Sequence, residues 1–281
     1  MDGLTLPRIR PGALFVWRRN ILVWRKLLIP AMLMNFGEPL LYLLGLGFGL
    51  GHFVGDMAGM PYLAFLASGI IASSAMTTAS FEGMYSVFTR MVPQKTYEAI
   101  LATPLDVDDI VAGEMLWCAT KALFSGIAIL AVAAVLGVVQ GWQALWVIPV
   151  VFLIGLCFAG PAIIMSSLAT TYDFFSYYFV LVVTPMFILC GVFYPVETLP
   201  EAVRGAVYVL PLTHAVHLTR GLVAGAELSQ PLLHLAVLAA YALVSYLIAA
   251  TLVRRKLMVG GDNYPVRTLK SNRTFNCEYV L

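Results

Sequence analysis

The chain has 281 residues, of which 60% are hydrophobic and only 11% are charged, and its formal net charge at pH 7 is +2. An ordinary soluble domain has about a quarter of its residues charged, so this composition excludes a soluble globular protein. It indicates an integral membrane protein, and we expect membrane lipid but no nucleic acid among its partners.

The first predicted element is an amphipathic helix that precedes the first long apolar segment. Apolar side chains recur there at alternating spacings of three and four residues, at Leu14, Trp17, Ile21, Trp24 and Leu28. Basic side chains fill the opposite face, at Arg18, Arg19, Arg25 and Lys26. This pattern is typical of a helix that lies flat in the membrane interface. The alternative, a cytosolic extension of the first span, stays open, although Pro30 offers a natural bend between the two.

Long apolar segments make up most of the remaining chain. A helix needs about 20 mostly apolar residues to cross a bilayer. Six segments meet this requirement, at 27–50, 61–81, 115–139, 144–169, 174–194 and 231–253. The first is too long for the apolar part of a secretory signal peptide, so we expect it to remain in the mature protein. The predicted fold is therefore an all-α integral membrane protein with six transmembrane helices.

The basic residues predict how these helices are oriented, because Lys and Arg near span ends are retained in the cytosol. Fourteen of the 17 precede the first predicted span, lie between the second and third, or follow the last. The opposite side receives only Arg204 and Arg220, while Lys121 lies within the third predicted span. An even number of spans with both termini in the cytosol satisfies this distribution.

The most polar internal stretch, residues 89–114, lies on the predicted cytosolic side between the second and third spans. We call it the elbow. Residues 96–102 are expected to form a short helix that Pro104 stops. Asp106 and Asp109 match a capping box, which places acidic groups at the positive end of the next helix. The elbow is therefore predicted to be a structured cytosolic surface.

A second unusual stretch, residues 195–230, lies on the opposite side before the last span. It is apolar but interrupted by Arg204, Pro211 and Arg220. Because it is too polar and too broken to span, we predict a broken re-entrant segment of two short helices that dip into the outer leaflet. No internal repeat is evident, so one membrane domain is expected over residues 1–259.

The sequence shows no catalytic or cofactor site. It has no GxxxxGK[ST] loop to hold the phosphates of ATP, so nucleotide energy must come from a partner. The glycine run at 45–51 lacks the spacing of a dinucleotide motif and indicates close helix packing. His214 and His217 are three residues apart but have no third ligand nearby in the sequence, and no metal site is predicted.

Ionisable residues within the predicted spans are candidates for function because their burial in hydrocarbon is costly. They are Glu38, Glu82, Glu114 and Lys121. Glu82 and Glu114 lie near cytosolic span ends, where water is close, and Glu114 shares a helix face with Lys121. Glu38 lies near the middle of the first span. It faces either a wet interior or interface, or a neighbouring helix in a purely structural contact.

Aromatic residues are densest at 172–179, at the cytosolic start of the fifth predicted span. One interpretation is an interfacial aromatic belt. The other is a stacking surface for an amphipathic substrate such as a lipid-linked sugar, formed by Phe175 and Tyr178.

Three stretches carry a resemblance to a known family. Residues 38–51 combine an acidic residue before proline with alternating glycines, residues 96–105 continue to Ile110 and Gly113-Glu114, and the external segment contains Pro195, Leu199-Pro200, Pro211-Leu212, His214, Arg220 and Gly221. These stretches resemble the ABC-2 type exporter permeases, in particular the NodJ-like subgroup that exports lipo-oligosaccharides. The similarity extends from about residue 10 to residue 256. Residues 260–281 match nothing in the family and are expected to be a cytosolic tail, either disordered or an artefact.

The resemblance implies the membrane subunit of an exporter in the bacterial inner membrane. Two copies would pair with two separate ATPase subunits, which bind ATP and Mg, and would move a lipo-oligosaccharide, a polysaccharide-lipid or a drug-like molecule outward along the dimer interface. The implied ATPase contacts are Tyr97, Glu98, Ala99, Leu101 and Pro104, and the implied translocation path includes Glu38, Phe175 and Tyr178. The rival function is an ion-coupled secondary transporter that uses the membrane carboxylates, although such carriers commonly show internal repeats.

Overall fold

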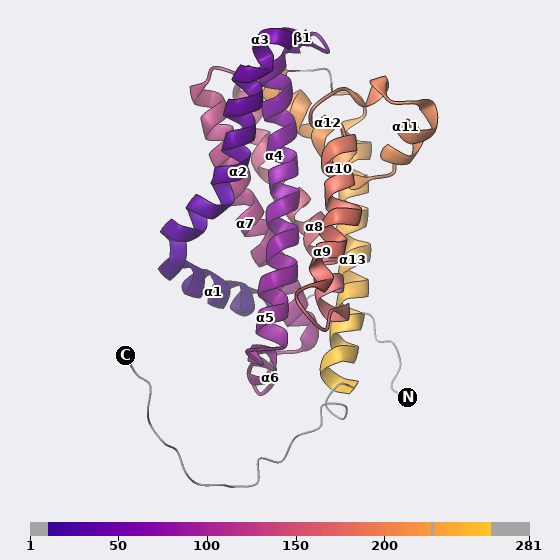
Figure 1. Ribbon diagram of the computed structural model, residues 1–281. Helices are drawn as coiled ribbons and strands as arrows, with labels where there is room; N and C mark the ends of the chain where they lie inside the picture. Colours follow the sequence, from indigo (N-terminus) through magenta and orange to yellow (C-terminus); the bar gives the residue numbers. More distant parts are fainter. Residues whose placement is uncertain (1–10, 226–227, 260–281) are drawn as a thin grey trace.

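The computed structural model describes residues 11–225 and 228–259, apart from the side chains of residues 27–36, 38, 39, 258 and 259. The tail predicted at 260–281 lies outside the described residues. Helices dominate the described chain, and Figure 1 shows most of them stacked side by side in an elongated bundle.

The α-helices follow one another along the whole described chain. The first half contains α1 (Gly12–Trp24), α2 (Leu28–Gly49), α3 (Gly51–Val54), α4 (Tyr62–Phe81), α5 (Val87–Met91), α6 (Thr96–Leu101) and α7 (Val107–Val135). The second half contains α8 (Val147–Leu168), α9 (Phe174–Tyr178), α10 (Thr184–Leu189), α11 (Glu201–Val207), α12 (Pro211–Ala224) and α13 (Pro231–Val259).

Shorter elements join these helices. The 3₁₀-helices are η1 (Arg25–Leu27), η3 (Trp142–Trp146) and η5 (Val196–Thr198), and the π-helical turns are η2 (Glu82–Ser86) and η4 (Phe179–Val183). Two short strands, β1 (Asp56–Met57) and β2 (Met60–Pro61), pair antiparallel in a hairpin that the all-α prediction did not include.

Four helical segments of the described chain are long and apolar enough to cross a membrane: Tyr62–Met91, Val107–Val135, Trp142–Leu168 and Pro231–Leu257. Two shorter apolar helices, Leu40–Val54 and Phe174–Leu189, correspond to the first and fifth predicted spans. The helical membrane fold is thus confirmed, while the number of six spans stays a prediction. The third span begins at Val107, earlier than the predicted residue 115, because the capping box starts the helix inside the elbow.

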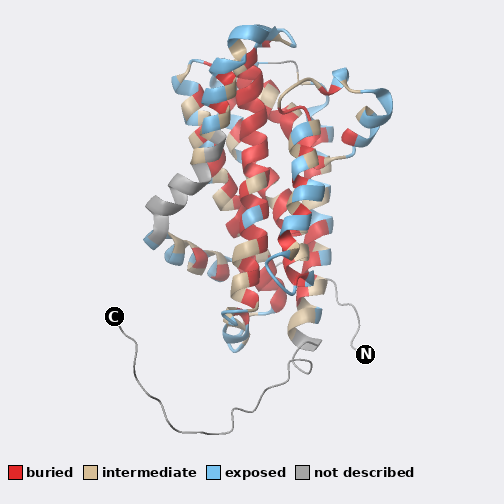
Figure 2. Ribbon diagram, in the orientation of Figure 1, coloured by how far each residue is buried: buried red, intermediate tan, exposed pale blue. Residues whose placement is uncertain are grey.

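Helix α4 forms the centre of the bundle. Figure 2 shows it buried along almost its whole length, and it contacts α2, α7, α8 and α12. Small residues allow such close packing where the hydrophobic effect does not drive helices together. A Cβ atom on Gly155 of α8 would lie 2.6 Å from the Cα atom of Ala119 on α7. The fold therefore depends on backbones that approach one another directly.

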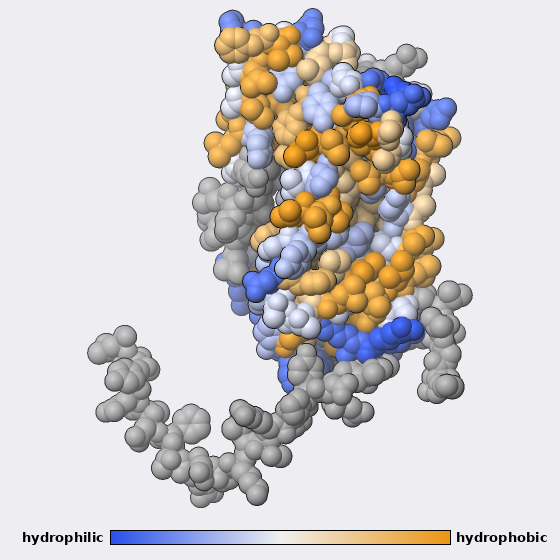
Figure 3. Space-filling model, turned by 45° about the vertical axis from the view of Figure 1, so that its right-hand side comes forward, coloured by the Kyte–Doolittle hydropathy of each residue, from blue (hydrophilic) through white to orange (hydrophobic). Residues whose placement is uncertain are grey.

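The bundle has two distinct ends. The elbow end carries α5 and α6, and the opposite end, which we call the hairpin end, carries the β1–β2 hairpin, α11 and α12 (Figure 1). Hydrophilic residues gather at the elbow end, whereas large apolar areas cover the side of the bundle in Figure 3. This arrangement is expected for a protein whose flanks face lipid.

Helix α1 confirms the predicted N-terminal helix, and it lies across the bundle near the elbow end, packed on α7 (Figure 1). Its packed face differs from the predicted apolar stripe. Ala13, Val16 and Asn20 are buried, whereas Leu14 is 55% exposed. The polar Asn20 lies inward because α7 offers it a hydrogen-bond partner there.

The elbow is structured as predicted. Helix α6 covers Thr96–Leu101, and the capping box is present at the start of α7. The Asp106 backbone N–H donates to Asp109 Oδ2 at 3.1 Å. The predicted re-entrant segment also consists of two short helices, α11 and α12. Both unusual stretches are thus helical connections with defined positions.

Candidate functional site

A buried cluster of charged residues lies between the elbow and the membrane helices. Its centre is Glu82, on the π-helical turn that extends α4. One carboxylate oxygen accepts hydrogen bonds from Trp117 Nε1 at 2.7 Å and from Arg90 at 3.2 Å. The other accepts one from Lys121 Nζ at 2.7 Å. The Glu82 side chain is only 7% exposed, so these three donors replace the water it would otherwise bind.

Arg90 links this carboxylate to a second one. Its guanidinium lies 3.2 Å from Glu82 and 2.9 Å from Glu114, whose side chain is 1% exposed. Two carboxylates and two cations, Arg90 and Lys121, therefore occupy one buried region. A buried charge without a partner costs roughly several kcal/mol of stability. Each charge here therefore stabilises the protein by compensating its oppositely charged neighbours.

The cluster reaches the N-terminal helix as well. Asn20 Nδ2 of α1 donates to Glu114 Oε2 at 3.0 Å. Nearby, Trp17 Nε1 of α1 donates to Thr120 Oγ1 of α7 at 2.9 Å. These two bonds fix α1 on α7 at the level of the charge cluster.

Tyr97 brings the elbow itself into the cluster. It lies on α6, is 1% exposed, and places its hydroxyl beside Glu114 and Arg90. Burial raises the pKa of this hydroxyl well above its usual value, so Tyr97 stays neutral. The hydroxyl also interacts with the Glu114 and Arg90 side chains by hydrogen bonding. Tyr97 of α6 therefore links the elbow to charged side chains of α5 and α7.

Most of the remaining predicted ATPase-contact residues lie at the surface of the elbow. Glu98, Ala99 and Pro104 are exposed, and Leu101 is half-buried. The Glu98 carboxylate is 3.8 Å from Lys95 Nζ, and both side chains are well exposed. The residues predicted to contact the ATPase thus fall into two groups. Glu98, Ala99 and Pro104 are exposed, whereas Tyr97 is buried inside the protein. The elbow shows no clear amphipathic period, so sequence pattern alone does not separate the exposed residues from the buried one.

The predicted translocation residues are placed differently. The Glu38 side chain lies outside the described residues. Phe175 is completely buried, with its ring 5.0 Å from that of Tyr85 and 5.4 Å from that of Phe88, and Tyr178 is 7% exposed. Both side chains pack against their own chain in this conformation. The open side of the same aromatic segment is carried by Tyr177, which is 65% exposed.

The hairpin end holds a separate polar group. His214 and His217 do share one face of α12, and both meet His234 at the start of α13. The Nδ1 atoms of His214 and His234 are 2.7 Å apart, and the His217 ring stacks on that of His234. Among the described residues, no group of three or more His, Cys, Asp or Glu is arranged to hold a metal ion. The histidines therefore join two helices.

One expectation about the membrane charges needs correction. Glu82 and Glu114 are buried within the protein, although a position near water was expected for both. Lys121, which shares a helix face with Glu114, pairs with Glu82 of the π-helical turn. The reason is tertiary: the close packing of α4 on α7 brings Glu82 to Lys121. One sequence signal could have indicated this cluster: the two acidic residues, Glu82 and Glu114, equal in number the basic residues near them, Arg90 and Lys121.

The apolar helices, the paired charges among them and the exposed elbow define a multi-pass membrane permease. The chain belongs to the ABC-2 type transporter family, which matches residues 13–223. This confirms the family that the sequence resemblance indicated.

Curated relatives agree with this assignment. The chain is 44% identical to Nodulation protein J of Rhizobium meliloti strain 1021 over 243 residues, which cover 86% of this chain and 93% of that protein. It is 45% identical to Nodulation protein J of Rhizobium leguminosarum bv. viciae over 258 residues, 92% of this chain and 100% of that protein. It is also 26% identical to Inner membrane transport permease YadH of Escherichia coli K12, over 72% of this chain and 78% of that protein.

Proposed function

We propose that this chain is the membrane-spanning subunit of an ATP-driven exporter, which moves an amphipathic, sugar-bearing molecule outward across the bacterial inner membrane. The observation that carries the proposal is the charge cluster, which joins the exposed elbow to α1, α4 and α7 through Tyr97, Arg90 and Glu114. The family membership supports a separate ABC ATPase subunit, and the name of the nodulation relatives supports a substrate that acts in nodulation.

The proposed topology places the elbow end in the cytosol, where Glu98, Ala99, Leu101 and Pro104 contact the ATPase. Two copies of the chain pair with two ATPase subunits, which hold ATP and Mg. The substrate path lies between the copies and includes Glu38 and the aromatic segment with Phe175 and Tyr178. Lipo-oligosaccharides, polysaccharide-lipids and drug-like amphiphiles all match this class of substrate, and the aromatic segment favours a sugar-bearing lipid.

The elbow transmits the force of ATP binding in this mechanism. Closure of the ATPase dimer displaces α6, and Tyr97 transfers the displacement to Glu114 on α7 and Arg90 on the extension of α4. Because buried ion pairs have few alternative partners, the helices move with the cluster as one body. The interface between the two copies then opens toward the outside, which requires two global states of the dimer.

The family membership favours this mechanism over the ion-coupled carrier that the membrane carboxylates had left open. Two of the membrane carboxylates that such a carrier would use, Glu82 and Glu114, are each paired with a basic side chain. The side chain of the third, Glu38, lies outside the described residues. Paired carboxylates of this kind are expected to hold helices together.

The experiment compares two elbow variants of the full chain, co-expressed with its ABC ATPase. Glu98→Lys reverses an exposed charge and is expected to reduce the co-purified ATPase at least about tenfold, by placing repulsion at the interface. Tyr97→Ala leaves the exposed surface unchanged, so the ATPase is expected to stay bound while ATP-driven export falls at least about tenfold.

Tyr97→Phe serves as the control because it keeps the ring in its buried position. Co-purification is measured by quantitative immunoblotting. Export is measured as the ATP-dependent accumulation of labelled substrate inside inverted membrane vesicles, whose cytosolic face points outward. Full ATPase binding by Glu98→Lys, or by a chain that lacks residues 96–102, would show that the elbow is not the docking surface. Normal export by Tyr97→Ala would remove the coupling role of the cluster.

A further inference from the structure

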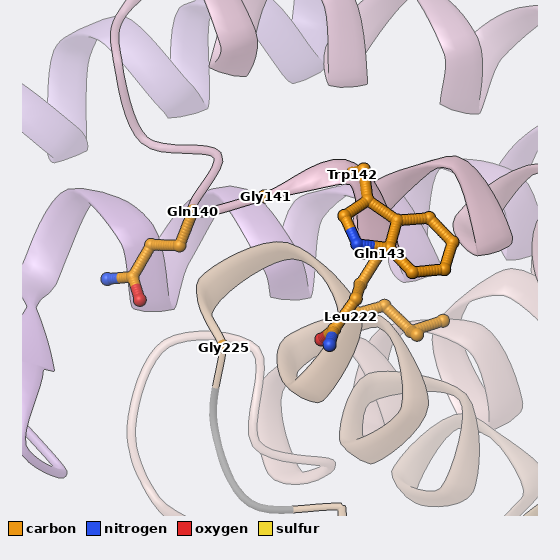
Figure 4. A pocket seen from close by; sticks show the side chains of 6 residues that line it. All are labelled: Gln140, Gly141, Trp142, Gln143, Leu222 and Gly225. Carbon is orange, nitrogen blue, oxygen red and sulfur yellow. The ribbon is translucent and has the colours of Figure 1, made fainter.

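A small cavity opens at the hairpin end of the bundle, far from the charge cluster. Its volume is about 220 Å³, and its lining residues are Gln140, Gly141, Trp142, Gln143, Leu222 and Gly225 (Figure 4). It lies between the link that joins α7 to α8 and the last turn of α12. Two parts of the chain that are about eighty residues apart in sequence therefore form one site.

The backbone fixes the relative positions of the two parts. The Gln140 backbone N–H donates to the Val223 carbonyl oxygen of α12 at 3.1 Å. Gly225 ends α12 with a φ of +66°, and a Cβ atom there would lie 2.8 Å from Gln140 Oε1. Only glycine adopts this backbone conformation without strain while leaving room for the Gln140 amide.

The lining side chains offer a specific chemistry. Trp142 is 73% exposed, and in Figure 4 its indole lies beside the side chains of Gln143 and Leu222. An indole presents a flat apolar face with one polar N–H, and each glutamine amide can both donate and accept hydrogen bonds. A sugar ring needs this combination, because it has an apolar C–H face and hydroxyl groups around its rim.

The charge of the lining and the volume of the cavity restrict the class of ligand further. No side chain that lines the cavity carries a charge, so the lining does not match a phosphate or a carboxylate. The volume suits one small ring, whereas drug-sized pockets span roughly 300–1,000 Å³. The site therefore matches a single neutral sugar unit.

The position of the cavity matches the path of a lipid-linked sugar. It lies at the point where two membrane-spanning segments, Val107–Val135 and Trp142–Leu168, meet at the hairpin end. The neighbouring side chains Leu145 and Trp146 are 63% and 59% exposed, as expected for residues at the membrane boundary. A sugar attached to a lipid lies at this level while its acyl chain remains in the bilayer.

We propose that this cavity is a subsite for one neutral sugar unit of the exported glycolipid, which Trp142 holds by stacking and Gln143 holds by hydrogen bonds. The proposal rests on the proposed function, which places the hairpin end on the outer face of the membrane. The subsite captures the sugar after it has crossed and keeps it from returning.

The test uses the purified full chain in lipid nanodiscs without any ATPase, titrated with cellotetraose and chitotetraose as neutral sugar probes. Binding is followed by saturation-transfer NMR. Wild type is expected to bind at least one probe saturably. Trp142→Ala and Gln143→Ala are expected to weaken this binding at least about tenfold, because each removes a central contact.

Trp146→Ala is the matched control, since it removes an exposed tryptophan of the same 3₁₀-helix that does not line the cavity. Its affinity is expected to equal that of wild type. An equal loss of probe affinity in Trp142→Ala and Trp146→Ala would assign both indoles to membrane anchoring and overturn the subsite. The absence of saturable binding to either probe would also overturn it. Size-exclusion profiles and thermal unfolding of each variant exclude loss by misfolding.

The two proposals fail separately in this design. If the probes bind at Trp142 but no ATP-driven export is found, the exporter function fails while the subsite stands. If export proceeds normally in Trp142→Ala and the probes do not bind, the subsite fails while the exporter function stands.

Discussion

At the residue scale, Glu82 illustrates how this protein accommodates charge within apolar helices. Its carboxylate receives hydrogen bonds from Trp117, Lys121 and Arg90, which belong to α7 and to the α5 extension of α4. Removing one charged side chain of such a group leaves a buried charge without an opposite partner. Removing one acidic and one basic side chain together leaves the net charge of the group unchanged.

The first prediction follows from this asymmetry. Glu82→Gln is expected to lower the free energy of unfolding by about 3 kcal/mol, because Lys121 then loses its carboxylate partner and Arg90 keeps only Glu114. The double variant Glu82→Gln with Lys121→Met is expected to recover part of this loss. Thermal unfolding in detergent measures both. Glu98→Gln, which changes an exposed carboxylate, is the control, and an equal unfolding temperature for Glu82→Gln and Glu98→Gln would contradict the prediction.

At the element scale, short helices at both ends are attached to the long ones by polar contacts. At the hairpin end, Arg220 of α12 donates to the Gly191 carbonyl oxygen at 2.6 Å and lies over the ring of Phe65. The Nε2 atom of His214 is 2.9 Å from the Tyr208 carbonyl oxygen, and its Nδ1 atom pairs with His234. Imidazole contacts thus attach helix α12 to α13.

This attachment predicts a pH dependence. Burial, together with the neighbouring His234 and Arg220, lowers the pKa of His217 from its ordinary value of 6.5 to about 4, against a weaker opposing effect of Glu197. A depressed histidine pKa means that the folded state prefers the neutral ring. The resulting stability is fully present above pH 6.5 and is lost as the pH falls from there toward about 4.

Hydrogen exchange measures this loss locally. Backbone amides of α12 are expected to exchange faster at pH 5 than at pH 7.5, after correction for the intrinsic rate, while those of α4 stay protected. The other groups that face His217 are His214 and Tyr208. In His217→Gln the acid-induced change is expected to shrink. Unchanged protection of α12 between the two pH values would show that the histidines do not control its attachment.

At the scale of the whole molecule, a buried central helix is surrounded by apolar flanks. Helix α4 is covered by its neighbours, whereas Leu181 on η4 and Leu41 on α2 are 70% and 73% exposed. Such surfaces face either lipid or a second copy of the chain. The proposed dimer places the second copy against the α2 and α9–α10 side.

Cysteine cross-linking tests this arrangement. Leu181→Cys, in a chain with Cys277 replaced by Ser, is expected to form a disulfide-linked dimer in native membranes under mild oxidation. Cys118, Cys157 and Cys190 are buried and should not interfere. Val135→Cys, at a position that is 87% exposed at the end of α7, is the control and should stay monomeric on a non-reducing gel. Dimers from Val135→Cys alone would place the interface on the other flank.

Much of the fold could be predicted from local signals. The capping box at Asp106 and Asp109, the short helix at 96–102 and the broken segment before the last helix all depend on neighbours in sequence, and all three are present. The strands at 56–61 were missed because each has only two residues, too few for an alternating pattern.

The candidate site was harder to predict. Tyr97 lies on the predicted elbow helix, but its burial against Arg90 and Glu114 depends on how the elbow folds back on the long helices. His234 was not connected with His214, because twenty residues separate them. Hydrophobic pattern gives no information about which polar side chains meet between helices.

The sequence by itself determined that the chain lies in a membrane, because composition and apolar segment length depend only on transfer of side chains from water to lipid. It also determined the family and the absence of a phosphate-binding loop. Only the tertiary structure decided that Glu82, Arg90, Glu114 and Lys121 form one neutral cluster. The physical reason is that the position of a charge along a helix is local, whereas its partner is selected by the packing of several helices.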